Sequence, residues 1–359
     1  MEKTYAVIPA YEVVINGKNV TDDISMFVSQ VEYSDRIEEA SDEVSLVIDD
    51  IAGLWQSDWY PQQGDSLSLK IGYPGNMLDC GDFEIDEIEL TGQPDVLTVK
   101  AIAAAITTSL RTRKSRAFEK QTLKDIAQFV ADKHGLTLMG DTSRLANIEI
   151  GRKTQDNESD LSFLASVARK FGIIFSVRGD QLIFLNPEEL EKSDSIASFK
   201  RYQLSRYSFK DKTSDTYEAA TVSRRDVKTN TVVDWRLDSS GDPTKMDEVV
   251  VDERVENASQ AEALAGGAIR ESNKDKLTGS FSTDGNILLV AGANLELEGF
   301  GAFSGKWTIK ESTHRISVDS GYTTEVSIRK GPYKKTFEKV STKKEGRSEV
   351  DWLKDLGLS

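Results

Sequence analysis

Alternating apolar and polar residues dominate the first 110 positions of the chain. The stretches EVSLVID (43–49) and DSLSLKIGY (65–73) both follow this period of two. Asn16-Gly17 lies between two extended runs and is a strong signal for a hairpin turn. Because strands with one buried face show this alternation, we expect short strands in a compact barrel or sandwich.

The phase of the alternation changes within CGDFEIDEIEL, residues 80–90. The apolar residues fall at odd positions up to Ile85 and at even positions from Ile88 onward. Since a slip of one residue moves every side chain to the other face of a sheet, this change predicts a β-bulge at Asp86-Glu87.

Helical spacing replaces the alternation after residue 120. QTLKDIAQFVADKHG and SDLSFLASVARKFG place apolar residues three and four positions apart. Thr122 with Asp125 predicts a capping box, and Gly135 and Gly172 predict the helix ends. The apolar residues that we expect to face a shared core are Leu123, Ile126, Val130, Leu161 and Leu164. Short apolar strands follow both helices, so this region predicts an α/β insert.

Strand patterns return from about residue 197 and predict a second β-domain. A helical stretch within it, SQAEALAGGAIRES, contains Gly266-Gly267. Each glycine inside a helix costs about 1 kcal/mol relative to alanine. Such glycines are often tolerated where a neighbouring backbone comes close. The predicted fold class is mainly β with an α+β insert.

Composition limits the possible functions. The 359 residues exceed one ordinary domain, and the net charge of −15 argues against a nucleic-acid-binding face. One cysteine, Cys80, and two histidines, His134 and His314, are too few for a usual zinc site. The first residues lack the features of a signal peptide, and no apolar run approaches the ~20 residues of a membrane helix. We therefore expect a protein made and assembled in a cytoplasm.

The acidic strand is the first candidate for chemistry, since paired carboxylates can act as a general acid and base. A catalytic pair would need one carboxyl group in an apolar pocket that raises its pKa. Nothing in the sequence supplies such a pocket, so a solvated strand face is the favoured interpretation. The residues concerned are Asp82, Glu84, Asp86, Glu87 and Glu89.

Other motifs do not support catalysis or cofactor binding. GFGAFSGKW resembles a phosphate loop, but Phe300 and Trp307 occupy positions that require glycine and serine or threonine. DNESD at 156–160 lacks the glycine and glutamate of a calcium loop, and a helix cap is its expected role. We expect both histidines to be structural and Cys80 to be buried. The residues favour a structural or interaction protein, with no cofactor and no metal.

The chain resembles the late control protein D family, the central hub of contractile phage-tail baseplates, over most of residues 10 to 330. The segments WYPQQGDSLSLKIGY and DCGDFEIDEIEL are family-like. The most specific match is LLVAGANLELEGFGAFSGKWTIKESTHRISVDSGYTTEVSIRK. It combines spaced glycines with aromatic residues, at Gly292, Gly299, Gly301, Gly305, Trp307, His314, Gly321 and Tyr322. The family is related to the hub part of type VI secretion spike proteins.

This resemblance implies two small β-barrel tube domains joined through the α/β insert, in a ring-forming homotrimer. The implied divisions are 1–112 and 197–330 for the tube domains, 113–196 for the insert and 331–359 for a charged C-terminal linker and docking tail. Two β-domains per chain give six around a trimer, which suits a sixfold tail tube and a threefold spike. The implied partners are the tail tube protein, a separate spike protein, and also a tape-measure protein and baseplate wedge proteins. DNA is expected only as passing cargo, and the place of the protein is the virion tail baseplate.

The last residues contain a second candidate site. VDWLKDLGL concentrates apolar residues at the end of a polar segment, and Trp352, Leu353 and Leu356 are the candidate partner-binding residues. A short helix that folds back on its own subunit is the alternative. Two other functions stay open at this point, namely a tail-associated cell-wall hydrolase that uses the acidic strand and a type VI-like effector carrier.

Overall fold

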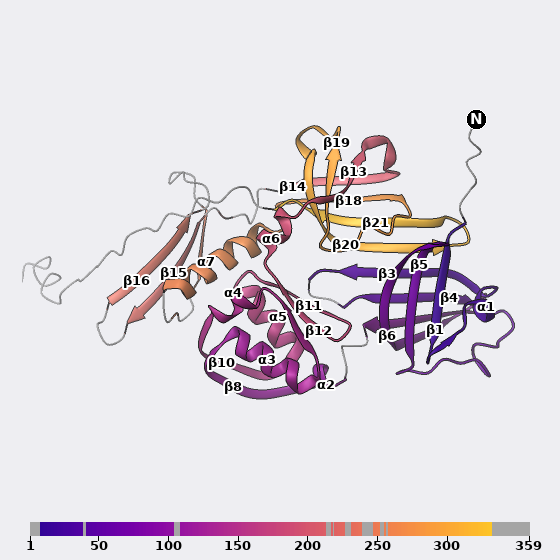
Figure 1. Cartoon of the computed structure of the whole chain (residues 1–359), viewed down its shortest axis with the longest axis horizontal. Helices are drawn as coiled ribbons and strands as arrows, with labels where there is room; N and C mark the ends of the chain where they lie inside the picture. The colour runs from indigo at the N-terminus through magenta and orange to yellow at the C-terminus, as the bar shows by residue number, and fades with distance from the viewer. Residues whose placement is uncertain are drawn as a thin grey trace, which may run out of the picture.

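A long, mostly antiparallel sheet runs through the protein, with an α/β region packed beside it (Figure 1). The structure is a computed structural model. It describes residues 8–38, 41–103, 108–212, 217, 219–226, 231–238, 247–251, 255 and 258–331.

The first β unit contains seven strands and one short helix. Its strand order in the sheet is β3-β4-β7-β6-β5-β1-β2. The predicted Asn16-Gly17 turn is confirmed, since both residues have positive φ between the paired strands β1 and β2. The elements are β1 (Ala10–Ile15), β2 (Lys18–Asn19), α1 (Thr21–Ile24), β3 (Val28–Arg36), β4 (Glu43–Asp49), β5 (Ser66–Tyr73), β6 (Asn76–Thr91) and β7 (Val96–Ala103).

The second β unit comes from the chain after the insert. Its strands pair in the order β14-β18-β21-β20, and β19 connects β20 to β13. The elements are β13 (Ser195–Lys200), η1 (Arg201–Gln203), β14 (Arg206–Asp211), β18 (Leu277–Asp284), β19 (Asn294–Glu298), η2 (Gly301–Phe303), β20 (Gly305–Ser317) and β21 (Gly321–Arg329).

The two β units share one sheet of 13 strands, because β3 pairs directly with β20. The pairing runs antiparallel from Gln30 opposite Ser317 to Arg36 opposite Glu311. Strand β20 can pair with two strands on the same side because its first part pairs with β19 and its last part pairs with β3. Among the described residues neither unit closes into a barrel. Two β-barrels joined through the insert were expected; the described strands form no closed barrel, and backbone pairing joins the two β units in addition to the insert.

The insert has its own strands and helices. The ribbon β8-β10 and the small sheet β11-β12-β9 enclose helices α3 and α5. The capping box of Thr122 and Asp125 is confirmed, as is the left-handed Gly135 after α3. The elements are α2 (Thr108–Arg111), β8 (Arg113–Thr122), α3 (Leu123–His134), β9 (Thr137–Gly140), α4 (Thr142–Ala146), β10 (Glu149–Ser159), α5 (Asp160–Lys170), β11 (Ile174–Arg178), β12 (Gln181–Leu185) and α6 (Pro187–Lys192).

The predicted helical stripe faces a shared core. Leu123, Ile126, Val130 and Leu164 are fully buried in it, and Leu161 packs against it. The prediction of a common core for α3 and α5 is therefore confirmed.

A later part of the chain completes that core. The sheet β16-β15-β17 and helix α7 lie in the stretch expected for the second β-domain, yet their apolar residues pack with the insert. The core of the insert therefore includes residues beyond the expected boundary at 196/197, and the division of the chain into domains stays a prediction. The elements are β15 (Ala219–Asp226), β16 (Thr231–Asp238), β17 (Glu248–Val251) and α7 (Ala258–Asn273).

Gly267 explains how α7 approaches the insert. A Cβ atom on Gly267 would lie 2.2 Å from the carbonyl oxygen of Lys170 and 2.8 Å from the amide nitrogen of Gly172. The expected close passage of a neighbouring backbone is confirmed at this glycine. At Gly266 the nearest atom would be a side-chain carbon of Leu237, at 3.8 Å.

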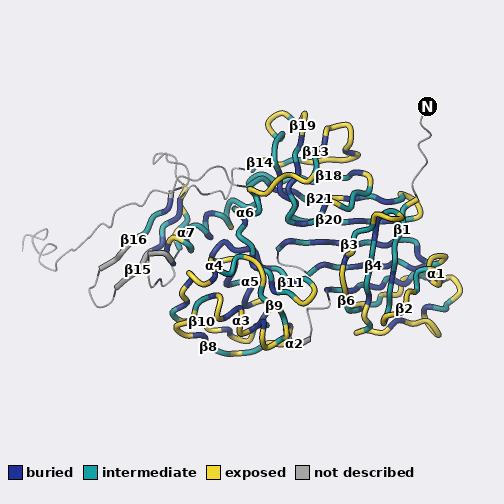
Figure 2. The backbone as a smooth tube through the Cα atoms, in the orientation of Figure 1, coloured by how far each residue is buried: buried dark blue, intermediate teal, exposed yellow. Residues whose placement is uncertain are grey.

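Burial follows the strands and leaves the turns exposed (Figure 2). Each β unit has its own apolar core on one side of the sheet, and the insert with α7 has a third. Among the described residues, no helix is long and apolar enough to cross a membrane.

Candidate functional site

The polar face of the continuous sheet is the largest candidate surface. In one row across the sheet, Arg315 of β20 lies opposite Glu32 of β3. Glu32 in turn lies opposite Ser45 of β4, and Ser45 lies opposite Lys100 of β7. The same row continues to Glu87 of β6. Because side chains opposite each other share a face, this row joins polar residues of both β units on the side away from the apolar cores.

The acidic strand β6 contributes to this face. The predicted bulge is confirmed, since the β6–β7 register shifts between Ile85 and Glu87. Glu84 lies opposite Ile102 of β7, and Glu89 lies opposite Thr98 of β7. Both β7 residues are on the same face as Lys100, and Ile102 is also opposite Glu43 of β4. The bulge therefore brings carboxylates from both sides of the phase change onto one face.

The surroundings of these carboxylates are wet. Asp82, Asp86, Glu87 and Glu89 are exposed and Glu84 is half-buried. Ser68 donates to Asp82 at 2.6 Å, Arg111 pairs with Asp86 at 3.1 Å and Lys100 pairs with Glu87 at 3.3 Å. No carboxyl group of this strand lies in the apolar pocket that a general acid requires. The structure therefore shows a solvated strand face at these residues.

Ion pairs cross the seam between the β units on the polar face. Arg36 of β3 contacts Glu311 of β20 at 2.7 Å and Glu43 of β4 at 3.7 Å. Arg315 of β20 contacts Glu32 of β3 at 2.8 Å. Half-exposed pairs of this kind contribute roughly 0–1 kcal/mol each, so they mainly fix the register of a seam held by backbone pairing.

A buried ionic cluster ties the insert to the same seam. Arg178 of β11 reaches Asp35 of β3 at 2.6 Å, and the second oxygen of Asp35 accepts from the Ala291 amide at 2.7 Å. Asp42 lies 3.9 Å from Arg178. Burial raises the pKa of Asp35 to about 6, against the opposing effect of Arg178. The cluster joins both β units and the insert at one point.

Sequence reasoning missed this cluster, although a signal was present. Val31 and Tyr33 alternate inward on β3, and Asp35 occupies the next inward position. A carboxylate where an apolar residue is expected indicates a buried partner. Its partner Arg178 lies 143 positions away and could not be identified from the sequence.

Both histidines have structural partners. His314 is fully buried on β20, where its ring contacts the Tyr322 hydroxyl at 2.8 Å and the Leu289 carbonyl at 3.0 Å. Burial lowers the pKa of His314 to about 4, so the ring is neutral at pH 7. His134 contacts the fully buried Asp160 at 2.9 Å. Both rings are therefore held by hydrogen-bonding partners inside the fold.

Asp160 organises a second ionic cluster inside the insert. It accepts from Lys114 at 2.7 Å and Gln155 at 3.0 Å, and it also pairs with Arg116. Although burial opposes ionisation, these hydrogen bonds and that of His134 lower the pKa of Asp160 to about 2. Ser159, within the DNESD segment, caps α5 as expected. Among the described residues no group of three or more His, Cys, Asp and Glu side chains is placed to hold a metal ion.

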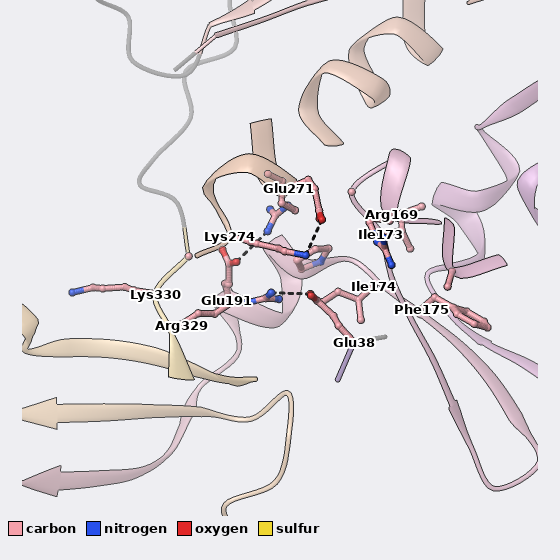
Figure 3. A pocket seen from close by; sticks show the side chains of 15 residues that line it. Glu38, Arg169, Ile173, Ile174, Phe175, Glu191, Glu271, Lys274, Arg329 and Lys330 are labelled. Atoms are coloured by element: carbon pink, nitrogen blue, oxygen red, sulfur yellow. Dashed lines mark hydrogen bonds and ion pairs between the residues drawn. The ribbon is translucent and has the colours of Figure 1, made fainter. Parts of the chain in front are cut away.

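A pocket marks the meeting point of all parts of the described chain (Figure 3). Arg329 of the second β unit pairs with Glu38 of the first at 2.8 Å. Arg270 of α7 pairs with Glu191 of α6 at 3.1 Å. These pairs bridge different parts of the chain around an apolar floor that includes Ile173, so the pocket is a joint between them.

Known proteins are similar to this chain in sequence and in fold. The sequence profile of the family described as phage tail baseplate hub (GPD) matches residues 84–320. The chain belongs to the phage tail baseplate hub family.

Two curated hub relatives match part of the chain. Both are named probable baseplate hub protein. The protein of Escherichia phage 186 is 29% identical over 181 residues, which is 50% of this chain and 46% of the relative. The protein of Escherichia phage P2 is 30% identical over 178 residues, which is 49% of this chain and 45% of the relative. Each match thus spans about half the length of the curated relative.

The fold also matches a solved tail protein. The 43 kDa tail protein of prophage MuSo2 from Shewanella oneidensis aligns with a TM-score of 0.68 at 13% identity. The alignment covers 89% of this chain and 98% of that protein. At this identity the likeness concerns the fold alone.

The hub-family residues predicted from the glycine-rich segment occupy turns and core positions. Trp307 is buried, and its indole nitrogen donates to the Phe303 carbonyl at 2.9 Å. Cys80 is buried, as expected. The glycines all take positive φ, which favours glycine over other residues, at Gly292, Gly299, Gly301, Gly305 and Gly321. A structural role for this segment of the hub stays a prediction. Trp352, Leu353 and Leu356 lie outside the described residues.

Proposed function

We propose that the chain is the structural hub of a contractile phage tail or a phage-derived injection particle, without catalysis. It forms a homotrimer that joins a sixfold tail tube to a threefold spike supplied by a separate protein. The observation that carries this proposal is the β3–β20 pairing, which makes one continuous wall from two β units. Three such chains supply six β units around a ring, and closed symmetric assemblies of this kind are common.

The polar face of the wall supports a role as the lining of a channel. Carboxylates outnumber cations across its central strands. The acidic residues include Glu32, Glu43, Asp82, Glu84, Glu87, Glu89 and Glu311, and the cations are Arg36, Lys100 and Arg315. Negative charge repels phosphates, so DNA would pass this wall as cargo without binding to it.

The other partners follow from the central position of a hub. The tail 331–359 would dock a spike or tape-measure protein through Trp352, Leu353 and Leu356, and wedge proteins would surround the ring. No feature of the described residues favours a hydrolase or an effector carrier. The place of the protein would be the baseplate of the particle.

Copy number in assembled particles tests the proposal. Electron cryomicroscopy of purified particles without imposed symmetry should give three copies beneath the tail tube. Interfaces of an obligate ring should bury upwards of ~2,000 Å² each. Two or six copies would overturn the trimeric hub. Peptidoglycan hydrolysis by the purified chain, abolished by Glu84→Gln and Asp86→Asn in a folded protein, would overturn the absence of catalysis.

A further inference from the structure

One end of the sheet carries an exposed apolar surface, which we call the distal rim. Four segments form it, namely residues 21–27, 49–60, 91–95 and 318–320. They meet because β3 begins, and β4 and β20 end, at this edge of the antiparallel sheet, as the pairs Val28–Ile48 and Gln30–Ser317 show. In Figure 1 the rim lies around α1 and the β20–β21 turn, at the end of the molecule farthest from α7.

Large aliphatic side chains on the rim are almost fully exposed. Met26, Ile51 and Val318 are 81%, 84% and 81% exposed, and each comes from a different segment. Trp59 and Tyr60, in the same rim, are about half exposed. Clustered exposed apolar residues on a soluble protein indicate an interaction surface.

The rim segments are held together in a fixed arrangement. The amide of Asp49 donates to the Phe27 carbonyl at 2.8 Å, and the amide of Val318 donates to the Ser29 carbonyl at 3.2 Å. The Phe27 ring contacts Trp59 edge to face with 5.8 Å between ring centroids. Because backbone hydrogen bonds join the segments to the sheet, the apolar groups form a preformed platform.

Charge around the platform restricts its partner. The exposed acidic residues of the rim are Asp22, Asp23, Asp49, Asp58 and Asp319. The four segments contain no lysine or arginine, and the nearby Lys18 is paired with Asp23 at 3.1 Å. Like charges would repel a second copy docked rim to rim, and they would also repel nucleic acid and anionic lipid.

We propose that the distal rim docks a protein ring whose end face carries apolar residues surrounded by lysine and arginine. This inference rests on the proposed function, which identifies that ring as the tail tube. The hub would then have a fixed polarity, with the distal rim toward the tube and the end that carries α7 away from it. Apolar contact would supply the affinity, and the aspartates would orient the partner.

Binding of the tail tube protein from the same particle to the full-length hub tests this polarity. Ile51→Asp and Val318→Asp should each weaken binding at least tenfold, because both lose apolar contact and add like charge. Asp22→Lys should weaken it as well, and raised salt should lower the affinity of the wild type. Tyr202→Asp is the matched control, since Tyr202 is 82% exposed on η1, outside the rim. Unchanged thermal midpoints would show that the variants are folded.

The outcomes separate the polarity from the hub function. Wild-type affinity for both Ile51→Asp and Val318→Asp would overturn the rim as the docking surface. Loss of binding in Tyr202→Asp alone would place the tube elsewhere and leave the hub function intact. If the rim variants changed only the number of hub copies per particle, the occupant would be a second copy of this chain, which also overturns the proposal. If purified wild-type particles contained no copy of this chain, that result would contradict the proposed function itself.

Discussion

Helices α5 and α7 can approach closely because Gly267 has no side chain. In Gly267→Ala the new Cβ would lie 2.2 Å from the Lys170 carbonyl oxygen, whereas real Cβ contacts are essentially never shorter than 3.0 Å. The obstructing atoms belong to the backbone, so no side-chain rotation can relieve the overlap. The helices would have to separate and open the core that they share.

The expected loss can be estimated from two opposing effects. Alanine stabilises a helix interior by about 1 kcal/mol relative to glycine. Overpacking a well-packed core costs about 1–3 kcal/mol, occasionally more. Because the obstructing atoms belong to the backbone, we expect a cost at the upper end, about 3 kcal/mol, so Gly267→Ala should lower the free energy of unfolding by about 2 kcal/mol after the helix gain is subtracted. Gly266→Ala is the matched control, because its new Cβ would meet nothing closer than 3.8 Å. This variant should gain up to about 1 kcal/mol in the free energy of unfolding.

Hydrogen exchange is the appropriate assay, because a chain with several apolar cores need not unfold in one step. Amides of α5 and α7 should lose protection about thirtyfold in Gly267→Ala, which corresponds to the 2 kcal/mol. Amides of the first β unit should keep their protection against exchange. Equal protection in the Gly266 and Gly267 variants would show that the helices do not approach as described.

Three further predictions concern the core, the seam and the tail. Leu164→Ala should lower the free energy of unfolding by about 2–5 kcal/mol in urea denaturation, and a loss below ~0.5 kcal/mol would place this side chain on the surface. Asp35 keeps its proton to higher pH in the folded state than in the unfolded one, so its contribution to stability falls as the pH rises from about 4 to 6. Asp35→Asn should therefore make the free energy of unfolding rise more steeply with pH in that window. His314 acts in the opposite direction to Asp35, because its lowered pKa makes its contribution to stability grow as the pH rises. If the free energies of unfolding of variant and wild type differed by the same amount at pH 4, 5 and 6, this prediction would be wrong. Deleting residues 345–359 should leave a folded trimer but give particles without a spike or of disturbed length, and normal infectious particles would refute docking by the tail.

Local pattern determined much of the structure. The period of two predicted the strands of the first β unit, and its change of phase predicted the bulge beside Asp86. Thr122 and Asp125 predicted the start of α3, since a cap involves residues only three positions apart. The helical stripe predicted the shared core of α3 and α5. In each case the interacting residues are near neighbours, so their spacing contains the information.

Tertiary structure alone decided the arrangement of these parts. Ser34 and Thr313, which contact each other across the seam, are 279 positions apart. An edge strand can pair with many partners through identical backbone groups, so no local pattern indicates that β3 joins β20. The same limit applies to α7, whose apolar face could cover either neighbouring core. The five carboxylates of β6 could be found in the sequence, but their shared wet face depends on which strands lie beside them. Backbone pairing is independent of residue type, and that is why the continuous wall could be known only from the folded chain.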